Sequence, residues 1–423
     1  MTTVAARSPE AAPLVARTVV IDDPGPLLAL LPHDSPLSWV HHGDGLVAWG
    51  EVARCEPTGA TRFVAAERWW RRLADHAVVR DEADVPGSGL VAFGSFAYAD
   101  DPGHSVLMVP SVVVGRRGDL SWFTTISEGT LGPAPTLGPA PTLGAAPGHR
   151  APTEVAFSDG AMDGAEWELV VGEAVRRIRA GELEKVVLAR DLIAELDEPL
   201  DVRAPLTQLA ERYPSCWTFN VDGLFGASPE MLVRRERGLV TSRVLAGTIR
   251  RTGDDAHDLA LAATLARSSK DLEEHEFAVR SVADALAPYC LSMNVPESPF
   301  VLHLPNVMHL ATDVTGVLDD RTSALGLAAA LHPSAAVGGT PTEAAVRMIA
   351  ELERMDRGRY AGPVGWLDAT GDGEWVIALR SAEYDGATVR LFAGCGIVAD
   401  SDPEAELAEA AAKFVPVRDA LSP

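Results

Sequence analysis

The sequence LFAGCGIVADSDPEAELAEAAAKF, residues 391–414, determines how the rest of the chain is interpreted. Its opening residues, 391–393, are apolar and predict a buried strand. The Gly-Cys-Gly run at 394–396 then predicts a tight turn, because glycine adopts backbone conformations that other residues avoid. Two residues without a Cβ also let backbone amides approach a ligand closely, so this turn is a candidate anion-binding element.

The helix predicted after this turn gathers acidic side chains and a lysine on one face. Asp402, which is followed by a proline, has the sequence of an N-cap before the first helical turn. Glu406 and Glu409 are three residues apart and so lie about 60° apart around the helix axis, and Lys413 shares that side. With the glycine amides, these groups suit a small anionic substrate bridged to a hard cation. The alternative is a solvated acidic helix with a Glu409–Lys413 ion pair.

A second acidic pair with the same spacing lies upstream, in SSKDLEEH at residues 268–275. Asp271 and Glu274 are again three residues apart on a predicted helix. Two such pairs on two helices can face each other across a cleft, and carboxylate oxygens with open water positions are the ligands that Mg²⁺ prefers. The spacing therefore favours a Mg²⁺ site, with a chance acidic pair on a helix surface as the alternative.

The composition indicates a globular protein and restricts its partners. The chain has 423 residues, of which 47% are hydrophobic, and a formal net charge of −24. Such acidity argues against nucleic acid and anionic membranes as partners. The four cysteines are scattered without CxxC spacing, which indicates a reducing compartment. No apolar stretch is long enough to span a bilayer and the N-terminus lacks the core of a secretion signal, so we expect a cytoplasmic protein.

The chain divides into two strand-rich regions separated by a repeat. We expect residues 1–16 to be disordered and residues 17–128 to supply the strands of an N-terminal half. TLGPAP occurs twice in the Pro- and Gly-rich tract 129–150, which predicts a mobile loop or linker. Sheets on either side of that loop could still pair with each other. Residues 151–423 hold all the candidate chemistry and are expected to form the catalytic region.

Residues 151–423 alternate runs of strands with helices. A helix with Trp167, Val171, Ala174 and Ile178 on one face is expected to end at Gly181. Further strands are predicted at 185–196, 216–251 (a meander) and 307–318, and helices at 256–287 (broken near 268–269), 324–331 and 341–354. Three last strands are predicted in YAGPVGWL, EWVIALRSAEYDG and TVRLFAGCGIV. This order favours an α+β fold over a doubly wound parallel sheet.

Lys185 and Glu230 are candidates for acid–base chemistry. Lys185 opens the apolar strand KVVLAR, where partial desolvation would lower the pKa of its ammonium group and make the neutral amine available as a base. Glu230 follows a proline between two strands in ASPEML and can act as a general acid if its surroundings raise its pKa. The alternatives are a strand-end lysine that reaches water and an exposed glutamate in a turn.

Several sequence runs, taken in order, resemble those of the chorismate-utilising enzymes, the family of isochorismate, salicylate, anthranilate and aminodeoxychorismate synthases. They are KVVLAR, FGASPEML, LAGTIRR, SSKDLEEHE, VMHLATDVTG, LHPSAAVGGTP, RGRYAGPVGW, ALRSAE and FAGCGIVADSDPEAELAEAAAK. Residues 17–128 resemble the family's variable N-terminal half only in their strand character. The resemblance implies an α+β fold with antiparallel β-sheets in a sandwich flanked by helices, and an active-site cleft near the C-terminal motifs.

The resemblance also implies a metal site made by the two acidic pairs. Glu274 and Glu409 fall where the family binds Mg²⁺. Asp271 and Glu406 fall at the supporting acidic positions, which act through water. The metal would in turn hold the ring carboxylate of the substrate, chorismate.

The implied substrate-binding residues come from several of these runs. Lys413 and the amides around Gly394 and Gly396 match positions that bind the ring carboxylate. Tyr360 and Arg380 match positions that bind the enolpyruvyl carboxylate. The remaining matches are to the cleft wall and the space beside the ring, namely Gly247, Thr248 and His309.

Within the family, the residue at the position of Lys185 separates the chemistries. Lysine there resembles the branch that adds water, whereas the anthranilate synthases lack this base and use ammonia. The resemblance therefore implies an isochorismate synthase, an isomerase in which Lys185 deprotonates a water that attacks C2 while Glu230 protonates the departing C4 hydroxyl. The alternatives are a salicylate synthase, an ammonia-using synthase component and an inactive binding protein on the same scaffold.

Two departures from the family pattern bear on these expectations. LHPSAAVGG replaces the more usual LHPTPAV-type run, which affects cleft shape and so product choice. GCG replaces GAG, and Cys395 is tolerated if its side chain points away from the ligand. We expect a monomer without a glutaminase partner, whose product serves menaquinone or siderophore synthesis.

Overall fold

The computed structural model describes residues 12–129, 151–304, 307–319 and 322–422, and it leaves the side chains of Lys270 and Glu274 outside the description. Most of the segment expected to be disordered, and the loop that contains the TLGPAP repeat, therefore lie outside the described residues. Residues 14–16 were assigned to the disordered terminus, and that assignment is wrong. They are buried at the start of the first strand, because Leu14 and Ala16 pack into the core.

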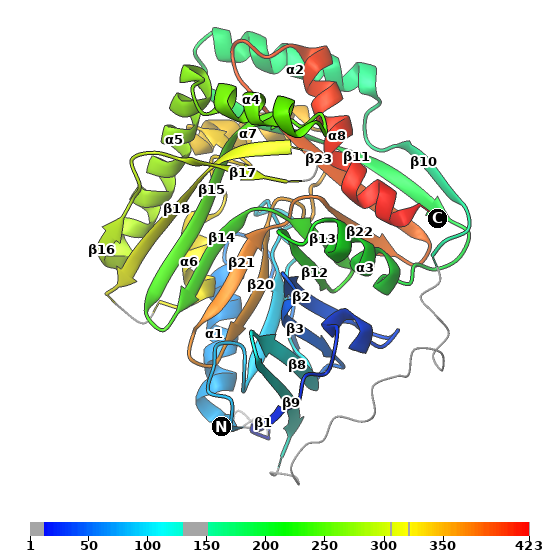
Figure 1. The fold of residues 1–423 in the computed structure, drawn as a ribbon, viewed down its shortest axis with the longest axis vertical. Helices are drawn as coiled ribbons and strands as arrows, with labels where there is room; N and C mark the ends of the chain where they lie inside the picture. The colour runs from blue at the N-terminus through cyan, green and yellow to red at the C-terminus, as the bar shows by residue number, and fades with distance from the viewer. Residues whose placement is uncertain (1–11, 130–150, 305–306, 320–321, 423) are drawn as a thin grey trace, which may run out of the picture.

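Two β-sheets flanked by helices make up the fold (Figure 1). The large sheet contains, in spatial order, β10 (Val155–Asp159), β11 (Lys185–Leu196), β23 (Thr388–Ile397), β22 (Ser381–Asp385), β13 (Leu224–Ser228), β12 (Trp217–Val221), β2 (Leu37–His41), β3 (Asp44–Trp49), β8 (Val112–Arg117), β9 (Leu120–Glu128), β1 (Leu14–Ile21) and β5 (Val78–Asp81), with β19 (Gly339–Thr340) beside β11. The small sheet contains β16 (Cys290–Asn294), β18 (Val307–Leu318), β15 (Leu239–Arg250), β14 (Met231–Glu236), β21 (Gly373–Ile377), β20 (Pro363–Asp368), β6 (Val91–Ser95), β7 (Val106–Val109) and β4 (Ala53–Cys55), with β17 (Phe300–His303) beside β18.

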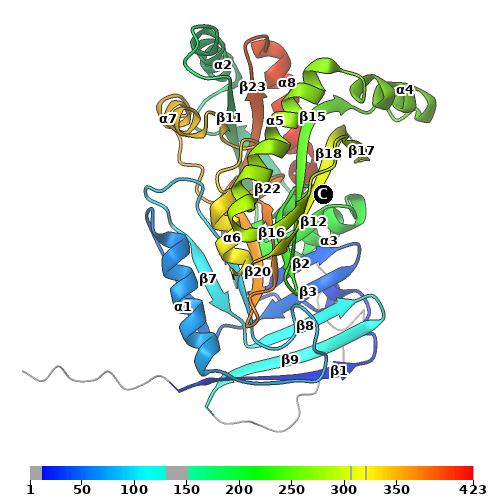
Figure 2. The ribbon, with the colours of Figure 1, turned by 90° about the vertical axis from the view of Figure 1, so that its left-hand side faces the viewer.

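Helices cover the outer faces of these sheets. They are α1 (Arg62–His76), α2 (Gly164–Arg179), α3 (Arg203–Arg212), α4 (Asp255–Leu265), α5 (Ser269–Leu286), α6 (Ala324–Leu331), α7 (Thr342–Leu352) and α8 (Pro403–Leu421), with short 3₁₀ turns at Leu27–Leu30 and Ala287–Tyr289. Figure 2 shows α2, α8, β11 and β23 together at one end of the molecule and β1, β8 and β9 at the other. Among the described helices, none is long and apolar enough to cross a membrane.

The residues before and after the 130–150 segment share both sheets. β2 pairs with β12 in the large sheet, and β6 pairs with β20 in the small sheet. Trp39 and Phe93 from the first half belong to the same hydrophobic cluster as Trp167 and Trp375 from the second. The two regions therefore form one folded unit, and the predicted α+β class with antiparallel sheets and flanking helices is confirmed.

The elements that carry the candidate site begin and end close to their predicted bounds. β11, β18 and α6 have the bounds that the sequence predicts. Asp163 caps α2 by accepting the Glu166 N–H at 2.8 Å, and Trp167 is buried on the predicted face. The chain turns out of this helix at Gly181, whose φ of +80° is strained for residues with a Cβ. The predicted break near 268–269 is also observed, between α4 and α5.

Two strand predictions near the candidate site are wrong. Gly394-Cys395-Gly396 is not a turn but part of β23, because β11 pairs along the whole run and outweighs the local preference of glycine. EWVIALRSAEYDG is not one strand but two, since β21 belongs to the small sheet and β22 to the large sheet. The chain crosses between the sheets at residues 378–380, where Arg380 has a φ of +48°.

A buried ion pair satisfies the backbone of β11 on its side away from β23. Glu353 and Arg357 are 1% and 3% exposed, and the guanidinium donates to Glu353 Oε2 at 2.8 Å. Arg357 also donates to the carbonyls of Val187 and Val337, at 2.7 and 2.9 Å. Glu353 Oε1 accepts the Ala189 N–H at 2.7 Å. The pair thus fixes β11 and the 334–338 loop to each other.

We expect Arg357→Ala to lower the free energy of unfolding by about 3–5 kcal/mol, because it leaves the Glu353 carboxylate buried without its cation. Urea denaturation followed by circular dichroism measures this change. Arg347→Ala is the matched control, since Arg347 and Glu343 form a 3.9 Å pair on α7 with side chains 68% and 94% exposed. The control should change stability by no more than about 0.5 kcal/mol. Equal effects of the two substitutions would show that the buried pair has no special role.

Candidate active site

A cavity of about 280 Å³ lies where the C-terminal motifs meet the start of β11. It brings together thirteen of the fourteen residues that the sequence identified as candidates: Lys185, Glu230, Gly247, Thr248, Asp271, His309, Tyr360, Arg380, Gly394, Gly396, Glu406, Glu409 and Lys413. The fourteenth, Glu274, is in α5, but its side chain lies outside the described part of the structure. The convergence predicted from separate sequence runs is therefore present in space.

Glu230 and Arg380 both lie where the chain passes from one sheet to the other. Glu230 follows β13 of the large sheet and precedes β14 of the small sheet, and Arg380 lies between β21 and β22. The Ile377 N–H donates to the Glu230 carbonyl at 3.1 Å, and the Ala227 N–H donates to the Arg380 carbonyl at 3.1 Å. These bonds hold the two crossings side by side. Both side chains line the cavity.

The Glu230 carboxyl is in an environment that favours its neutral form. The residue is 7% exposed, so it is not the exposed turn glutamate of the alternative interpretation. Burial raises its pKa to about 7, although the nearby cations Lys185, Arg380 and Lys413 act in the opposite direction. A substantial fraction of the carboxyl is therefore protonated near neutral pH. That is the state that a general acid requires.

The glycines of β23 present backbone groups to the cavity rather than to β11. Gly394 and Gly396 oppose Ala189 and Val187, whose own N–H and C=O groups bond to atoms outside β23. These are therefore non-hydrogen-bonded pairs, in which the N–H and C=O of each glycine point away from β11. Accordingly the Gly394 carbonyl accepts from Lys413 Nζ at 2.8 Å. The expected amide donors are available even though the predicted turn is absent.

Lys413 and Glu409 form a partly buried ion pair on α8. Lys413 Nζ lies 2.7 Å from Glu409 Oε1, with the two side chains 19% and 40% exposed. Burial opposes the charge of the ammonium group, but the Cys395 sulfur and the Glu409 carboxylate outweigh it and raise its pKa to about 12. Burial likewise opposes the charge of Glu409, and Lys413 outweighs it and lowers the pKa of that carboxyl. Both groups are charged at neutral pH.

The acidic residues of α8 fit a hard divalent cation. Glu406 and Glu409 each place a carboxylate oxygen, and Cys395 its sulfur, so that the three atoms lie within 4.8 Å of one another. Ser401 Oγ donates to Glu406 Oε1 at 2.8 Å, and Asp271 lines the same cavity from α5. Carboxylate oxygens on two helices are the donor set that Mg²⁺ favours. The Cys395 side chain contacts the Glu406 carbonyl at 3.4 Å and is not part of the cavity wall as described.

The cavity wall from β15 and β18 contains a β-bulge at Gly247. The pairing register shifts there, and Gly247 has a φ of +77°. A Cβ at this position would lie 3.2 Å from the Asp271 Cβ, so glycine allows α5 to approach the strand. Just beyond the bulge, Thr248 Oγ1 and His309 Nδ1 are 3.0 Å apart. Burial, reinforced by nearby cations, lowers the pKa of His309 to about 3, so its imidazole is neutral.

Tyr360 packs closely against β23. Its ring stacks on Phe392 with centroids 5.0 Å apart, and it is 4% exposed. Burial raises the pKa of its hydroxyl to about 12, with Arg357 acting in the opposite direction, so the phenol keeps its proton and can donate. A Cβ at Gly394 would lie 3.2 Å from this hydroxyl oxygen and 3.0 Å from the Leu188 carbonyl oxygen. Glycine thus allows the close approach of β23 to the phenol without a tight Cβ contact.

Comparisons with known proteins identify the family of this chain. Residues 137–422 match the family model described as chorismate binding enzyme. The chain belongs to the chorismate-binding enzyme family. The salicylate biosynthesis isochorismate synthase of Pseudomonas aeruginosa is 35% identical over 434 residues, a match that covers 97% of this chain and 90% of that protein. Isochorismate synthase DhbC of Bacillus subtilis is 43% identical over 256 residues, which covers 58% of this chain and only 64% of that protein, less than two thirds of its length.

Solved structures of this family show the same fold. The menaquinone-specific isochorismate synthase MenF from Escherichia coli superposes with a TM-score of 0.79 at 26% identity, covering 97% of this chain and 96% of that one. Anthranilate synthase component I from Streptococcus pneumoniae has a TM-score of 0.71 at 22% identity. That second likeness concerns the fold alone.

The cavity has wall residues that the sequence did not single out. Arg357, Phe392, Ala336 and Ser401 all line it. RGRYAGPVGW contains Arg357, but only its tyrosine was identified as a candidate, because an arginine before a turn has no local signature of burial. Phe392 was assigned to a buried strand without a role in the site.

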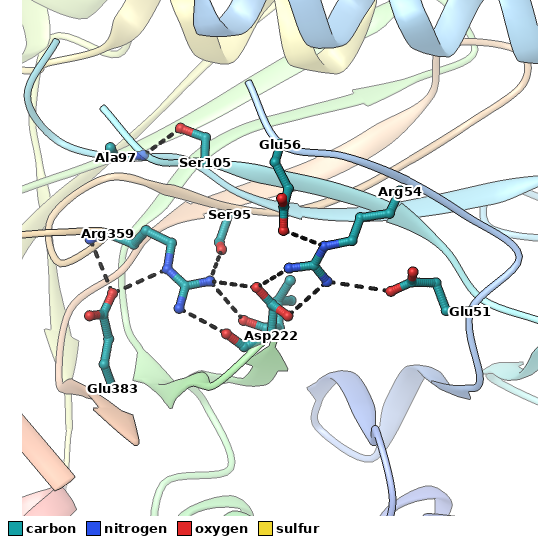
Figure 3. Close-up of polar contacts among 10 residues, drawn as sticks. Glu51, Arg54, Glu56, Ser95, Ala97, Ser105, Asp222, Arg359 and Glu383 are labelled. Carbon is teal, nitrogen blue, oxygen red and sulfur yellow. Dashed lines mark hydrogen bonds and ion pairs between the residues drawn. The ribbon is translucent and has the colours of Figure 1, made fainter. Parts of the chain in front are cut away.

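Arg359, the residue before the cavity tyrosine, fixes this segment to the rest of the chorismate-binding fold (Figure 3). Its guanidinium donates to Ser95 Oγ at 2.9 Å, to the Asp222 carbonyl at 2.8 Å and to Glu383 Oε1 at 3.1 Å. The Asp222 carboxylate accepts two bonds from Arg54, at 2.9 and 2.8 Å. Strands of the N-terminal half thereby support the wall of the cavity, although they supply none of its described lining residues.

Glu230→Gln should stabilise the fold more at high pH than at low pH. Burial raises the Glu230 pKa from 4.5 to about 7, so the folded state holds this proton more tightly and wild-type stability declines as pH rises from 4.5 to 7. Glutamine lacks this titration. Between pH 5.5 and 8.5, we expect the stability of the variant relative to wild type to rise by about 2 kcal/mol, measured by urea denaturation. Glu404→Gln, at an exposed position of α8, is the control and should show no such change.

Proposed function

We propose that this chain is a Mg²⁺-dependent isochorismate synthase, which converts chorismate to isochorismate. The observation that carries the proposal is that Lys185 and the protonatable, buried Glu230 line one cavity together with two further cations, Arg380 and Lys413. A base, an acid and two anion-binding cations are what the addition of water to a dicarboxylate ring requires. The isochorismate synthase names of its relatives support the same activity.

The two carboxylates of chorismate would bind to two different groups of cavity residues. We assign the enolpyruvyl carboxylate to the Arg380 guanidinium and the Tyr360 phenol, which donate hydrogen bonds to it. We assign the ring carboxylate to Lys413 and to the outward-facing N–H groups of Gly394 and Gly396. The net charge of −24 does not prevent this binding, because these cations reverse the local field inside the cavity.

The reaction itself needs one base and one acid. The Lys185 amine takes a proton from a water molecule, whose oxygen forms a bond to C2 of the ring. The ring double bonds shift, the C4–O bond breaks, and the Glu230 carboxyl gives its proton to the departing hydroxyl, which leaves as water. The reaction consumes one water and releases another, so it is an isomerisation and is reversible.

The metal would be held by carboxylates from two helices. We assign Mg²⁺ to Glu409 and Glu274, with Asp271 and Glu406 as the supporting acids, since the described members of this set face one cavity. When bound, Mg²⁺ supplies positive charge that positions and polarises the ring carboxylate. We further propose a cytoplasmic monomer that acts without a glutaminase subunit, in a pathway to menaquinone or a siderophore.

The first experiment incubates the purified protein with chorismate and Mg²⁺ and separates the products by chromatography at several times. We expect isochorismate and chorismate to reach a constant ratio, without pyruvate. Salicylate and pyruvate appearing together would instead identify a salicylate synthase. Turnover that depends on added ammonia would identify an aminating synthase, and no turnover under any of these conditions would leave a binding protein.

Glu230→Gln and Lys185→Ala should each lower kcat by about 10²–10⁴-fold, because each removes one of the two proton-transfer groups. Initial rates of isochorismate formation measure the effect. Glu404→Gln, at an exposed position of α8, is the matched control and should retain wild-type rates. Near-normal turnover by Glu230→Gln would show that another group is the acid.

Removal of divalent cations with EDTA should abolish turnover, and added Mg²⁺ should restore it. Glu409→Gln should raise the Mg²⁺ concentration needed for half-maximal activity by at least about tenfold, because it removes a charged ligand. Titration of initial rate against Mg²⁺ gives this concentration. Full activity of the EDTA-treated enzyme would exclude the proposed metal dependence.

A further inference from the structure

The proposed reaction releases a water molecule that must leave the site. Protonation of the C4 hydroxyl by Glu230 produces a water molecule beside that carboxyl, while the ring still fills the cavity. Unless this water moves away, it remains in place for the reverse reaction. The structure contains two further cavities next to the catalytic groups, and both bear on the fate of this water.

The first, which we call the rear cavity, lies behind Glu230. It is lined by Glu230, Ser242, Ala278, Ser334, Ala335 and Ala336, among others, and shares Glu230 and Ala336 with the main cavity. Its volume is about 10 Å³, close to the smallest space that holds one water molecule. Because the space is so small, a water molecule within it would lie close to all of the lining residues.

The rear cavity contains a hydroxyl that lacks a protein partner. Ser334 Oγ is buried and makes no hydrogen bond to any residue that the structure describes. The Ser242 hydroxyl, from another lining residue of this cavity, already donates to the Leu232 carbonyl at 2.6 Å. A buried polar group without a partner is costly and is normally satisfied by ordered water. Ser334 and the Glu230 carboxyl together supply the polar partners that such a water needs.

The second, which we call the outer cavity, borders the rear cavity and is open to the surface, and Lys185 and Val398 line both it and the main cavity. It has a volume of about 270 Å³ and shares Ala278 and Ala335 with the rear cavity. Its mouth is exposed: Phe277 is 46% exposed, and Glu184, Glu273 and Asp400 are exposed carboxylates. This acidic mouth repels a dicarboxylate substrate and admits neutral water. Where the two cavities meet, the residues that they share, Ala278 and Ala335, have small side chains.

We propose that the rear cavity receives the water released at C4 and passes it, through the outer cavity, to solvent. In each forward turnover the Glu230 proton joins the departing hydroxyl, and the resulting water moves to Ser334. In the reverse direction the same position supplies the water that adds to C4. Ser334 is therefore a positioning residue for the exchanging water. It lies in the LHPSAAVGG run, which departs from the family pattern and whose Ala336 also lines the main cavity.

The inference rests on the proposed isochorismate synthase activity, and it is tested with chorismate that carries ¹⁸O in the C4 hydroxyl. Bound isochorismate that returns to chorismate takes its C4 oxygen from the water beside Glu230. If the labelled water has left, the returning chorismate is unlabelled. The ratio of ¹⁸O loss from chorismate to isochorismate formation, measured by mass spectrometry in ordinary water, therefore reports how freely the released water escapes.

Ser334→Val and Ser334→Thr form a matched pair, because the two side chains have nearly the same shape and only threonine keeps the hydroxyl. We expect Ser334→Thr to retain the wild-type exchange ratio. Ser334→Val should lower it by about fivefold, since an apolar rear cavity stays dry and the released water returns to C4. Ala335→Val, which narrows the junction between the rear and outer cavities, should lower the ratio as well.

The possible outcomes distinguish a failure of this inference from a failure of the proposed activity. If wild-type protein does not convert chorismate, the proposed function fails and the inference with it. If wild-type protein converts chorismate but Ser334→Val and Ser334→Thr give equal exchange ratios, the function stands and the water route is wrong. A structural defect in Ser334→Val would slow turnover and exchange together and leave their ratio unchanged, which would also overturn the route.

Discussion

The site depends on how β11 is held, and the Glu353–Arg357 ion pair does much of this. The Ala189 N–H and the Val187 carbonyl face away from β23, and both would be unpaired without that pair. A buried backbone group without a partner costs about 1–3 kcal/mol, so strand and ion pair stabilise each other. Because these groups are satisfied on that side, the opposing glycines of β23 keep their own N–H groups free of β11. One buried ion pair thus helps to determine which amides of β23 face the cavity.

Helices and strands can be predicted well from the sequence where neighbouring residues determine them. Lys185 is the first residue of its strand because the apolar run KVVLAR begins there, and Asp402 caps its helix by accepting the Ala405 N–H at 3.0 Å. Prediction fails where residues far away in the chain determine the structure of a segment. The 394–396 run contains two glycines that favour a turn, yet it is a strand because β11, about 200 residues earlier, supplies its pairing partner. Likewise no local pattern in EWVIALRSAEYDG shows that the chain changes sheets at Arg380.

The same distinction applies to the candidate site residues. Their convergence could be predicted because the motifs keep their order along the chain, and thirteen of the fourteen candidates line one cavity. The physical state of each residue could not be predicted, since burial depends on the whole fold. Glu230 illustrates this: its turn sequence is equally compatible with exposure, whereas two sheets bury it and raise its pKa to about 7. The rear cavity is likewise a product of packing between distant elements, and no run of residues encodes it.

The positions of the lysines indicate where the proposed chemistry needs an ammonium group rather than a guanidinium. Only three of the chain's 36 basic Lys and Arg residues are lysines, and two of them, Lys185 and Lys413, line the cavity. Arginine supplies almost every other positive charge, including the buried and bidentate pairs at Arg357 and Arg54. A guanidinium cannot release its proton near neutral pH, so arginine could not serve as the base that we propose at position 185. Nor can its planar fork replace the compact ammonium of Lys413, which fits between the Gly394 carbonyl and Glu409. Lysine is thus kept where only a small or titratable cation performs the proposed chemistry.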